Sequence, residues 1–189
     1  MTRRGWLQVT FGAAGVIAVT AFINPLPRLM WNATASVPTG LYAIRSGDDR
    51  RLGELVAVAP PEPLAGFLAD GGYLPRGVPL LKHVAAMPGQ RVCRIGVVVS
   101  VDGRRIGSAR EQDRRGRLLP SWSGCRVIIQ GELFLMNPDA PDSLDGRYFG
   151  PLPATSVLGR ATPLWTDPPR HDRAAADHGS DFHPPNDRR

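Results

Sequence analysis

Val97-Val98-Val99-Ser100-Val101-Asp102-Gly103-Arg104-Arg105-Ile106 indicates a β-hairpin. The β-branched residues before Asp102 favour a strand, and Asp-Gly is typical of a tight hairpin turn. Short apolar runs between turn-forming residues continue in both directions along the chain. They predict strands over residues 41–44, 54–59, 79–86, 91–101, 132–136 and 157–162. Because helical periodicity is missing beyond the N-terminal segment, the fold class is predicted to be mainly β.

Composition supports one β-rich domain with appendages. Glycine and proline number 21 and 19 among 189 residues, a high content of turn formers for a helical protein. Apolar residues make up 42% of the chain, which is enough to form a core. The net charge of +6 suggests a nucleic-acid partner, but the arginines are scattered through turns and no basic run exceeds two residues. We therefore expect no nucleic-acid partner.

The N-terminal segment is predicted to be a membrane anchor. Residues 5–27 carry no charge, and 23 residues at about 1.5 Å each can cross a hydrocarbon core of about 30 Å. Arg3 and Arg4 precede the segment, which predicts a cytoplasmic N-terminus and an exported remainder. A cleavable secretory signal is the alternative, because Ala33-Thr34-Ala35 has the form of a cleavage site.

The C-terminal segment differs in composition from the rest of the chain. Residues 166–189 have almost no large apolar side chains, so they cannot bury enough surface to offset the cost of ordering. We predict a disordered tail whose histidines are solvated rather than metal-bound. The predicted organisation is a cytoplasmic N-terminus at 1–5, a transmembrane anchor at 6–27, a β-rich domain at 28–165 and the tail at 166–189.

Cys93 and Cys125 both lie in the predicted β-rich domain. In an oxidising compartment they would form one disulfide that closes a 32-residue loop, and two free buried thiols are the alternative. They have neither CxxC spacing nor a nearby histidine, so a zinc site is not expected. We predict no metal and no cofactor.

Lys82 is the sole lysine among 23 basic residues. Arginine keeps its proton in proteins, whereas a lysine in apolar surroundings can be a neutral amine near physiological pH. Residues 79–81 and 84–86 are apolar, so we expect a lowered pKa for Lys82 and a role as a general base. In a strand, His83 points to the opposite face. A lysine that reaches past its neighbours to solvent is the alternative.

A candidate nucleophile lies shortly after the apolar segment. Ser36 precedes the turn Pro38-Thr39-Gly40, which would fix its backbone and expose its hydroxyl. Its amide could act as an oxyanion donor, and Thr34 could add its hydroxyl. A serine that merely caps the turn fits the same pattern.

Three motifs together resemble those of the signal peptidase I superfamily, particularly its conjugative-transfer branch, the TraF peptidases. They are Ser-Val-Pro-Thr-Gly-Leu-Tyr at 36–42, Lys-His-Val-Ala-Ala-Met-Pro-Gly-Gln at 82–90 and Asp-Ser-Leu-Asp-Gly-Arg-Tyr-Phe-Gly-Pro at 142–151. They occur in the order typical of the family, and the resemblance extends from the N-terminal segment to about Trp165. It implies a signal-peptidase-like β fold.

The resemblance also implies roles at the matching positions. Ser36 would attack the scissile carbonyl, and unprotonated Lys82 would take its proton. Asp145 would orient the lysine or its surroundings from some distance, because a direct ion pair would raise the lysine pKa. Arg147 would hold that loop through a carboxylate. Gly146 stands where many members carry a serine, so a hydroxyl that would bond the base is missing there.

The implied activity is that of a membrane-anchored serine endopeptidase of the bacterial inner membrane, with its catalytic domain in the periplasm and membrane lipid as a partner. Its substrate would be an exported precursor such as a conjugative pilin, and the product would be either cleaved or cyclic. A non-catalytic envelope scaffold of a secretion or conjugation apparatus is the second hypothesis. A hydrolase that uses Ser36 and His83 is the third.

Overall fold

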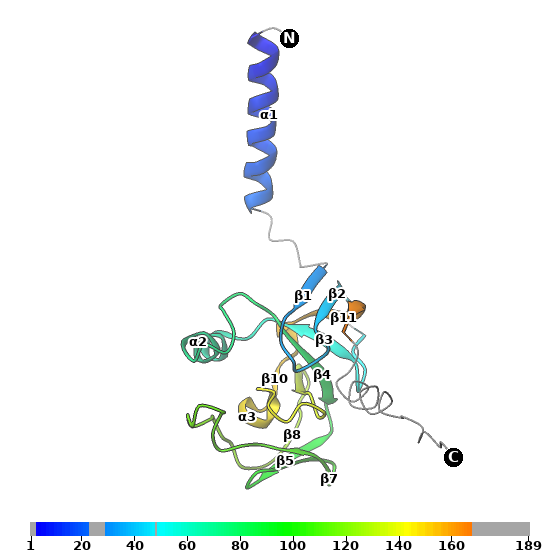
Figure 1. Cartoon of the computed structure of the whole chain (residues 1–189). Coiled ribbons are helices and arrows are strands. Elements are labelled where there is room, and N and C mark those ends of the chain that lie inside the picture. Colours follow the sequence, from blue (N-terminus) through cyan, green and yellow to red (C-terminus); the bar gives the residue numbers. More distant parts are fainter. Residues whose placement is uncertain (1–2, 23–28, 48, 168–189) are drawn as a thin grey trace, which may run out of the picture.

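Two antiparallel sheets form the body of the protein (Figure 1). The structure, a computed structural model, describes residues 3–22, 29–47 and 49–167. The larger sheet has seven strands in the order β1-β2-β11-β3-β4-β9-β10, and the smaller has four in the order β7-β6-β5-β8. The prediction of a mainly β fold is confirmed.

The elements of the larger sheet are β1 Leu29–Asn32, β2 Gly40–Arg45, β3 Leu55–Val58, β4 Leu80–Ala86, β9 Glu132–Met136, β10 Leu152–Pro153 and β11 Val157–Thr166. Those of the smaller sheet are β5 Arg91–Ile95, β6 Val98–Val101, β7 Arg104–Ser108 and β8 Gly124–Val127. The helices are α1 Arg3–Phe22, α2 Glu62–Asp70, α3 Gly146–Phe149 and a short 3-10 turn, η1 Ala154–Ser156.

Strand β4 lies inside the larger sheet, between β3 and β9, and carries Lys82. Lys82 is paired with Val56 of β3. Since residues two apart in a strand share a face, Lys82 stands in the same row as Leu80 and Val84. Val56 and Val84 belong to a buried apolar cluster, against which Leu80 packs. The surroundings of this lysine are therefore apolar along its own strand and across the sheet.

The smaller sheet contains the predicted hairpin. β6 ends at Val101 and β7 begins at Arg104, so the Asp-Gly turn is confirmed. The prediction of one strand over 91–101 is wrong, because β5 and β6 are separated by a turn at Gly96, whose φ is 59°. Glycine adopts this left-handed conformation without steric cost, and here it reverses the chain inside an otherwise apolar run.

Several elements were not predicted from the sequence. Strands β1, β8 and β10 have four residues or fewer. Helix α2 has nine residues and buries Leu64 and Leu68. Segments of this length are too short for a periodic apolar pattern to stand out.

The N-terminal segment is helical over Arg3–Phe22. Among residues 3–22, 29–47 and 49–167, no helix is both long and apolar enough to cross a membrane, so the span predicted over 6–27 is not found there. Residues 23–28 lie outside the described residues. The predicted tail also lies outside them from residue 168 onward, whereas Thr166 ends β11.

Candidate active site

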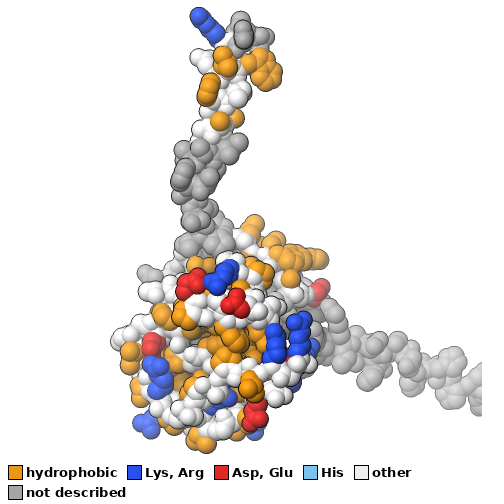
Figure 2. All heavy atoms as spheres, turned by 90° about the vertical axis from the view of Figure 1, so that its left-hand side faces the viewer, with side chains coloured by type: hydrophobic (Ala, Val, Ile, Leu, Met, Phe, Trp, Pro, Cys, Tyr) orange, Lys and Arg blue, Asp and Glu red, His pale blue; other side chains and the backbone are white. Residues whose placement is uncertain are grey.

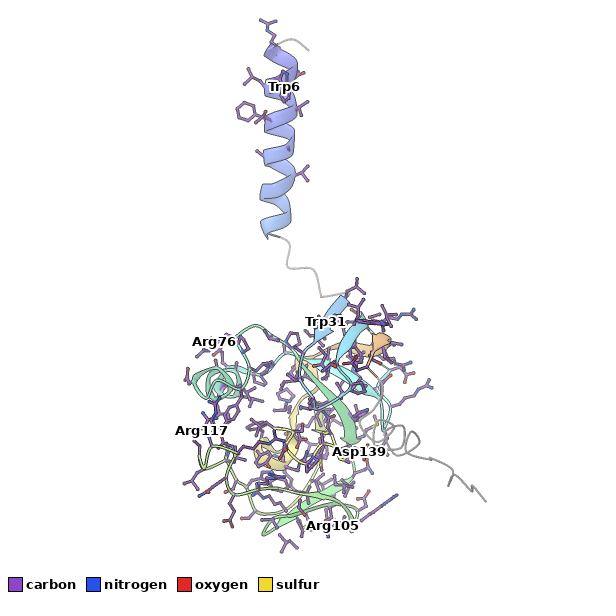
Figure 3. The ribbon with its side chains drawn as sticks, viewed as in Figure 1. Trp6, Trp31, Arg76, Arg105, Arg117 and Asp139 are labelled. Atoms are coloured by element: carbon purple, nitrogen blue, oxygen red, sulfur yellow. A yellow bond between two sulfur atoms is a disulfide. The ribbon has the colours of Figure 1, made fainter. Side chains whose placement is uncertain are left out.

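One pocket is lined by residues of all three sequence motifs. Its volume is about 600 Å³, and its lining includes Ser36 from the β1–β2 loop, Lys82 from β4, and Ser143 from the loop before α3. On the face that carries α2, apolar side chains gather between charged ones (Figure 2). Arg117 and Asp139, which also line the pocket, are labelled in Figure 3. Ser36 and Lys82 are 46 positions apart in the sequence, and Lys82 and Ser143 are 61 apart. The sheet therefore brings distant residues to one cavity.

The rim of the pocket is tied together by polar contacts. Arg110 and Arg114 both pair with Asp142, which precedes Ser143 in the chain. Asp113, next to Arg114 in the chain, accepts from the Tyr73 hydroxyl at 2.7 Å, and this hydrogen bond contributes most to the low pKa of the Asp113 carboxyl. Exposed ion pairs add little stability, so we assign these contacts to the placement of the rim rather than to the strength of the fold.

The β1–β2 loop presents Ser36 at a half-buried position. The loop is closed where Asn32 pairs with Gly40, and the Tyr42 hydroxyl donates to the Pro38 carbonyl at 2.6 Å. Among the hydrogen bonds of the described residues, none uses the Ser36 amide. That N–H can therefore serve a developing oxyanion, as the sequence predicts.

Thr34 lies beside Ser36, with 3.4 Å between the two hydroxyl oxygens. The Thr34 hydroxyl donates to the Asn32 Oδ1 atom at 2.8 Å. Because a hydroxyl has one hydrogen, Thr34 accepts from Ser36 in this arrangement. The predicted donation from Thr34 to an oxyanion would require its hydroxyl to leave Asn32.

Lys82 is buried, with 3% of its surface exposed. Burial lowers the pKa of its ammonium to about 8, nearby Asp145 opposes this effect, and Arg147 adds to it. Its Nζ donates to the Ser143 Oγ atom at 2.7 Å. The alternative of a solvent-reaching lysine is excluded by this burial. Near pH 8 about half of the molecules hold a neutral amine, the form that can accept a proton.

Asp145 and Arg147 form a buried ion pair next to Lys82, with side chains at most 1% exposed. The Asp145 carboxylate accepts from two side-chain nitrogens of Arg147, at 2.9 and 2.8 Å, and from the backbone N–H of Asn137 at 3.0 Å. Arg147 also donates to the Ala140 carbonyl at 2.6 Å. The guanidinium offsets part of the carboxylate's effect on the pKa of Lys82, and burial outweighs the rest, so this pKa stays below its usual value.

Ser143 was missed by sequence reasoning, although it stands in the third motif. The absence of a serine at position 146 had suggested that the base lacks a hydroxyl partner, and Ser143 supplies one. A Cβ atom at Gly146 would lie 2.7 Å from the Phe134 ring and 2.8 Å from the Leu135 carbonyl oxygen. Glycine at position 146 is therefore required by packing. The available signal was that Ser143 follows Asp142 in the motif and lies close to Asp145.

His83 points away from this site. Its Nδ1 is 3.0 Å from the Asn137 Oδ1 atom, and it does not line the pocket with Ser36.

Cys93 and Cys125 lie in the smaller sheet, where they form a disulfide between β5 and β8. In the part of the chain that the structure describes, no group of three or more His, Cys, Asp or Glu residues could hold a metal ion.

Comparisons with known proteins identify the family of the chain. Residues 3–165 match the family model described as signal peptidase, peptidase S26, and the chain belongs to this family. The chain is also similar to curated proteins named as conjugal or plasmid transfer proteins TraF. A conjugal transfer protein TraF of Agrobacterium tumefaciens is 39% identical, covering 87% of this chain and 97% of the relative. A probable conjugal transfer protein TraF of Sinorhizobium fredii is 36% identical over 87% and 89%.

A plasmid transfer protein TraF of Escherichia coli is 30% identical, over 85% of this chain and 94% of that protein. The crystal structure of a signal peptidase I from Enterococcus faecalis aligns with a TM-score of 0.38 at 18% identity, covering 62% of this chain and 100% of that one. The family resemblance seen in the three motifs is thus confirmed by the family model and the curated relatives.

Proposed function

We propose that this chain is a serine endopeptidase in which Ser36 is the nucleophile and Lys82 the general base. The observation that carries the proposal is a buried lysine, with its pKa lowered to about 8, in the pocket that Ser36 lines. A neutral amine in this position can accept the serine proton, which arginine could not do.

The proposed reaction has two halves. The Ser36 hydroxyl turns its hydrogen from Thr34 to Lys82, which takes the proton while the Ser36 Oγ–carbonyl carbon bond forms, and the Ser36 amide donates to the oxyanion. The ammonium then returns the proton to the leaving amine as the peptide bond breaks. In the second half, water or a substrate amine attacks the acyl group and passes a proton to Lys82, which gives it to the Ser36 oxygen as the acyl–oxygen bond breaks. Ser143 would keep the Nζ atom of Lys82 oriented during both halves.

We further propose that the substrate is an exported precursor, such as a conjugative pilin. The names of the TraF relatives support a role in conjugal or plasmid transfer. The disulfide between Cys93 and Cys125 favours an oxidising compartment such as the periplasm. Anchorage at the inner membrane by the N-terminal segment, with lipid as a partner, is part of this proposal.

A fluorophosphonate probe with a fluorophore tests the catalytic claim. The probe forms a Ser36 Oγ–phosphorus bond and releases fluoride, and the serine proton passes to Lys82. We expect labelling of the full chain at Ser36, located by peptide mass spectrometry, and none in Ser36→Ala. Lys82→Arg should lose it because arginine stays protonated. Arg105→Met, at an exposed position outside the pocket, is the matched control and should label as the wild type does.

Two outcomes would redirect the proposal. Equal labelling of wild type and Lys82→Arg would remove the base assignment. Absence of labelling in folded wild-type protein would favour the non-catalytic envelope scaffold. The acceptor of the acyl group is decided separately, by the mass of the mature pilin from cells with and without this protein. A cyclic product is one water lighter than the linear product.

A further inference from the structure

Asn32 is a buried polar residue, 5% exposed, at the end of β1 and at the start of the loop that carries Ser36. The two hydrogens of its amide nitrogen are shared among three carbonyl oxygens of this loop: those of Thr34 at 2.8 Å, Val37 at 3.2 Å and Pro38 at 3.0 Å. Its Oδ1 atom accepts from the Thr34 amide at 3.1 Å and from the Thr34 hydroxyl at 2.8 Å. One side chain thus binds the loop on both sides of Ser36.

The chemistry of an amide is required at this position. The nitrogen faces acceptors alone and the oxygen faces donors alone, so neither end can be replaced by the other. A carboxylate would place negative charge against the carbonyl oxygens of the loop, and an aliphatic side chain would leave buried groups without partners. A purely space-filling role would not explain contacts that all end on the residues around Ser36.

Asn32 also determines the direction of the hydroxyls in the loop. Because it takes the single hydrogen of Thr34, the oxygen of Thr34 faces Ser36 as an acceptor at 3.4 Å. The position of the Ser36 oxygen is therefore set in two ways: by the hydrogen bonds that fix the backbone of the loop, and by the contact between the Ser36 and Thr34 hydroxyls. Lys82 belongs to a different strand, β4, and has a different hydrogen-bond partner.

We propose that Asn32 is a positioning residue, which fixes the loop and the Thr34 hydroxyl so that the Ser36 oxygen is placed for attack. This inference rests on the proposed function of Ser36. Asn32 acts on the position of the nucleophile and leaves the base unchanged. Its loss therefore slows the attack at every pH without moving the pH at which the attack sets in.

The test compares labelling of Asn32→Leu and wild type by the fluorophosphonate probe, with the full chain in detergent. We expect a rate constant about 10- to 100-fold lower, since a small displacement of a reacting atom has effects of this size. The pH midpoint should stay at the wild-type value, and the final stoichiometry should still reach one label per chain. Arg105→Met, at an exposed position outside the pocket, is the control and should label at the wild-type rate.

Each outcome decides the proposal. A wild-type rate in Asn32→Leu would overturn it. A lower labelling stoichiometry with an unchanged rate constant would show a merely structural role and would overturn the proposal. A shifted pH midpoint would show that Asn32 acts through the base, and it would overturn the proposal too. If thermal melting shows that Asn32→Leu does not fold, exposed Thr34 decides instead. Thr34→Val should label about 10-fold more slowly and Thr34→Ser should recover most of the rate, whereas equal rates would refute the assignment. If the wild-type protein is not labelled, the result refutes the proposed function of Ser36 itself, whereas a labelled wild type with an equal rate in Asn32→Leu refutes the role of Asn32 alone.

Discussion

The pH dependence of the attack by Ser36 follows from the burial of Lys82. Moving the pKa of this lysine from 10.5 to about 8 raises its neutral fraction at pH 7 from about 0.03% to about 9%, roughly a 300-fold gain. Because only the neutral amine accepts a proton, activity is lost as the pH falls through about 8. We expect the labelling rate to rise about tenfold per pH unit below this value and to level off above about pH 9.

The measurement is the second-order rate constant of probe labelling from about pH 6 to about pH 10, with Ser36→Ala as the blank for reaction of the probe with other groups. Wild-type protein should show a single ionisation. A profile without an ionisation in this range, or a midpoint near the ordinary lysine value of 10.5, would refute the reasoning from burial. Either result would mean that Lys82 is solvated or that another group accepts the proton.

Three substitutions test the surroundings of the base. Lys82→Met should stabilise the fold at pH 7 by about 3 kcal/mol, because below about pH 8 a charged group is buried in the folded chain and solvated in the unfolded one. By the same linkage, wild-type stability should rise from about pH 8 to 10.5, where the unfolded chain still binds the proton. Urea unfolding of both proteins across this range checks the sign, and a variant less stable than the wild type at pH 7 would contradict it. Ser143→Ala should label about 10- to 100-fold more slowly, because the Lys82 amine loses the partner that orients it. Ser156→Ala, which removes an exposed hydroxyl outside the pocket, provides the comparison. Gly146→Ser should lower thermal stability by about 1–3 kcal/mol, since its side chain would collide with the Phe134 ring. An unchanged melting temperature would show that the site can accept the family serine after all.

The sheet pattern was predictable where strands are long and their turns are explicit. The Asp102-Gly103 turn and the strand around Lys82 follow from local residue preferences. The turn at Gly96 was hidden because apolar residues continue on both sides of a single glycine. Residues 65–77 indicated only a short turn of helix or a loop, because the nine residues of helix α2, Glu62–Asp70, give too little periodicity to show its extent.

The candidate site was predictable in part. The lone lysine in an apolar run indicated a base, and Ser36 before a turn indicated a nucleophile. Asn32 and Ser143 gave no such indication, because single Asn and Ser residues are common at turns for many reasons. Their importance lies in what their side chains contact across the loop and across the sheet.

The sequence by itself determined the local chemistry: a mainly β chain, an amine among apolar neighbours, a hydroxyl on a turn, and three motifs in the order of the S26 family. These properties depend on residues that are adjacent in the chain. Only the tertiary structure decided that Ser143 is the partner of Lys82, that Arg147 pairs with Asp145, and that position 146 has no room for a side chain. The physical reason is that pKa values, hydrogen-bond partners and free volume depend on groups brought together from distant strands, and linear patterns do not encode those distances.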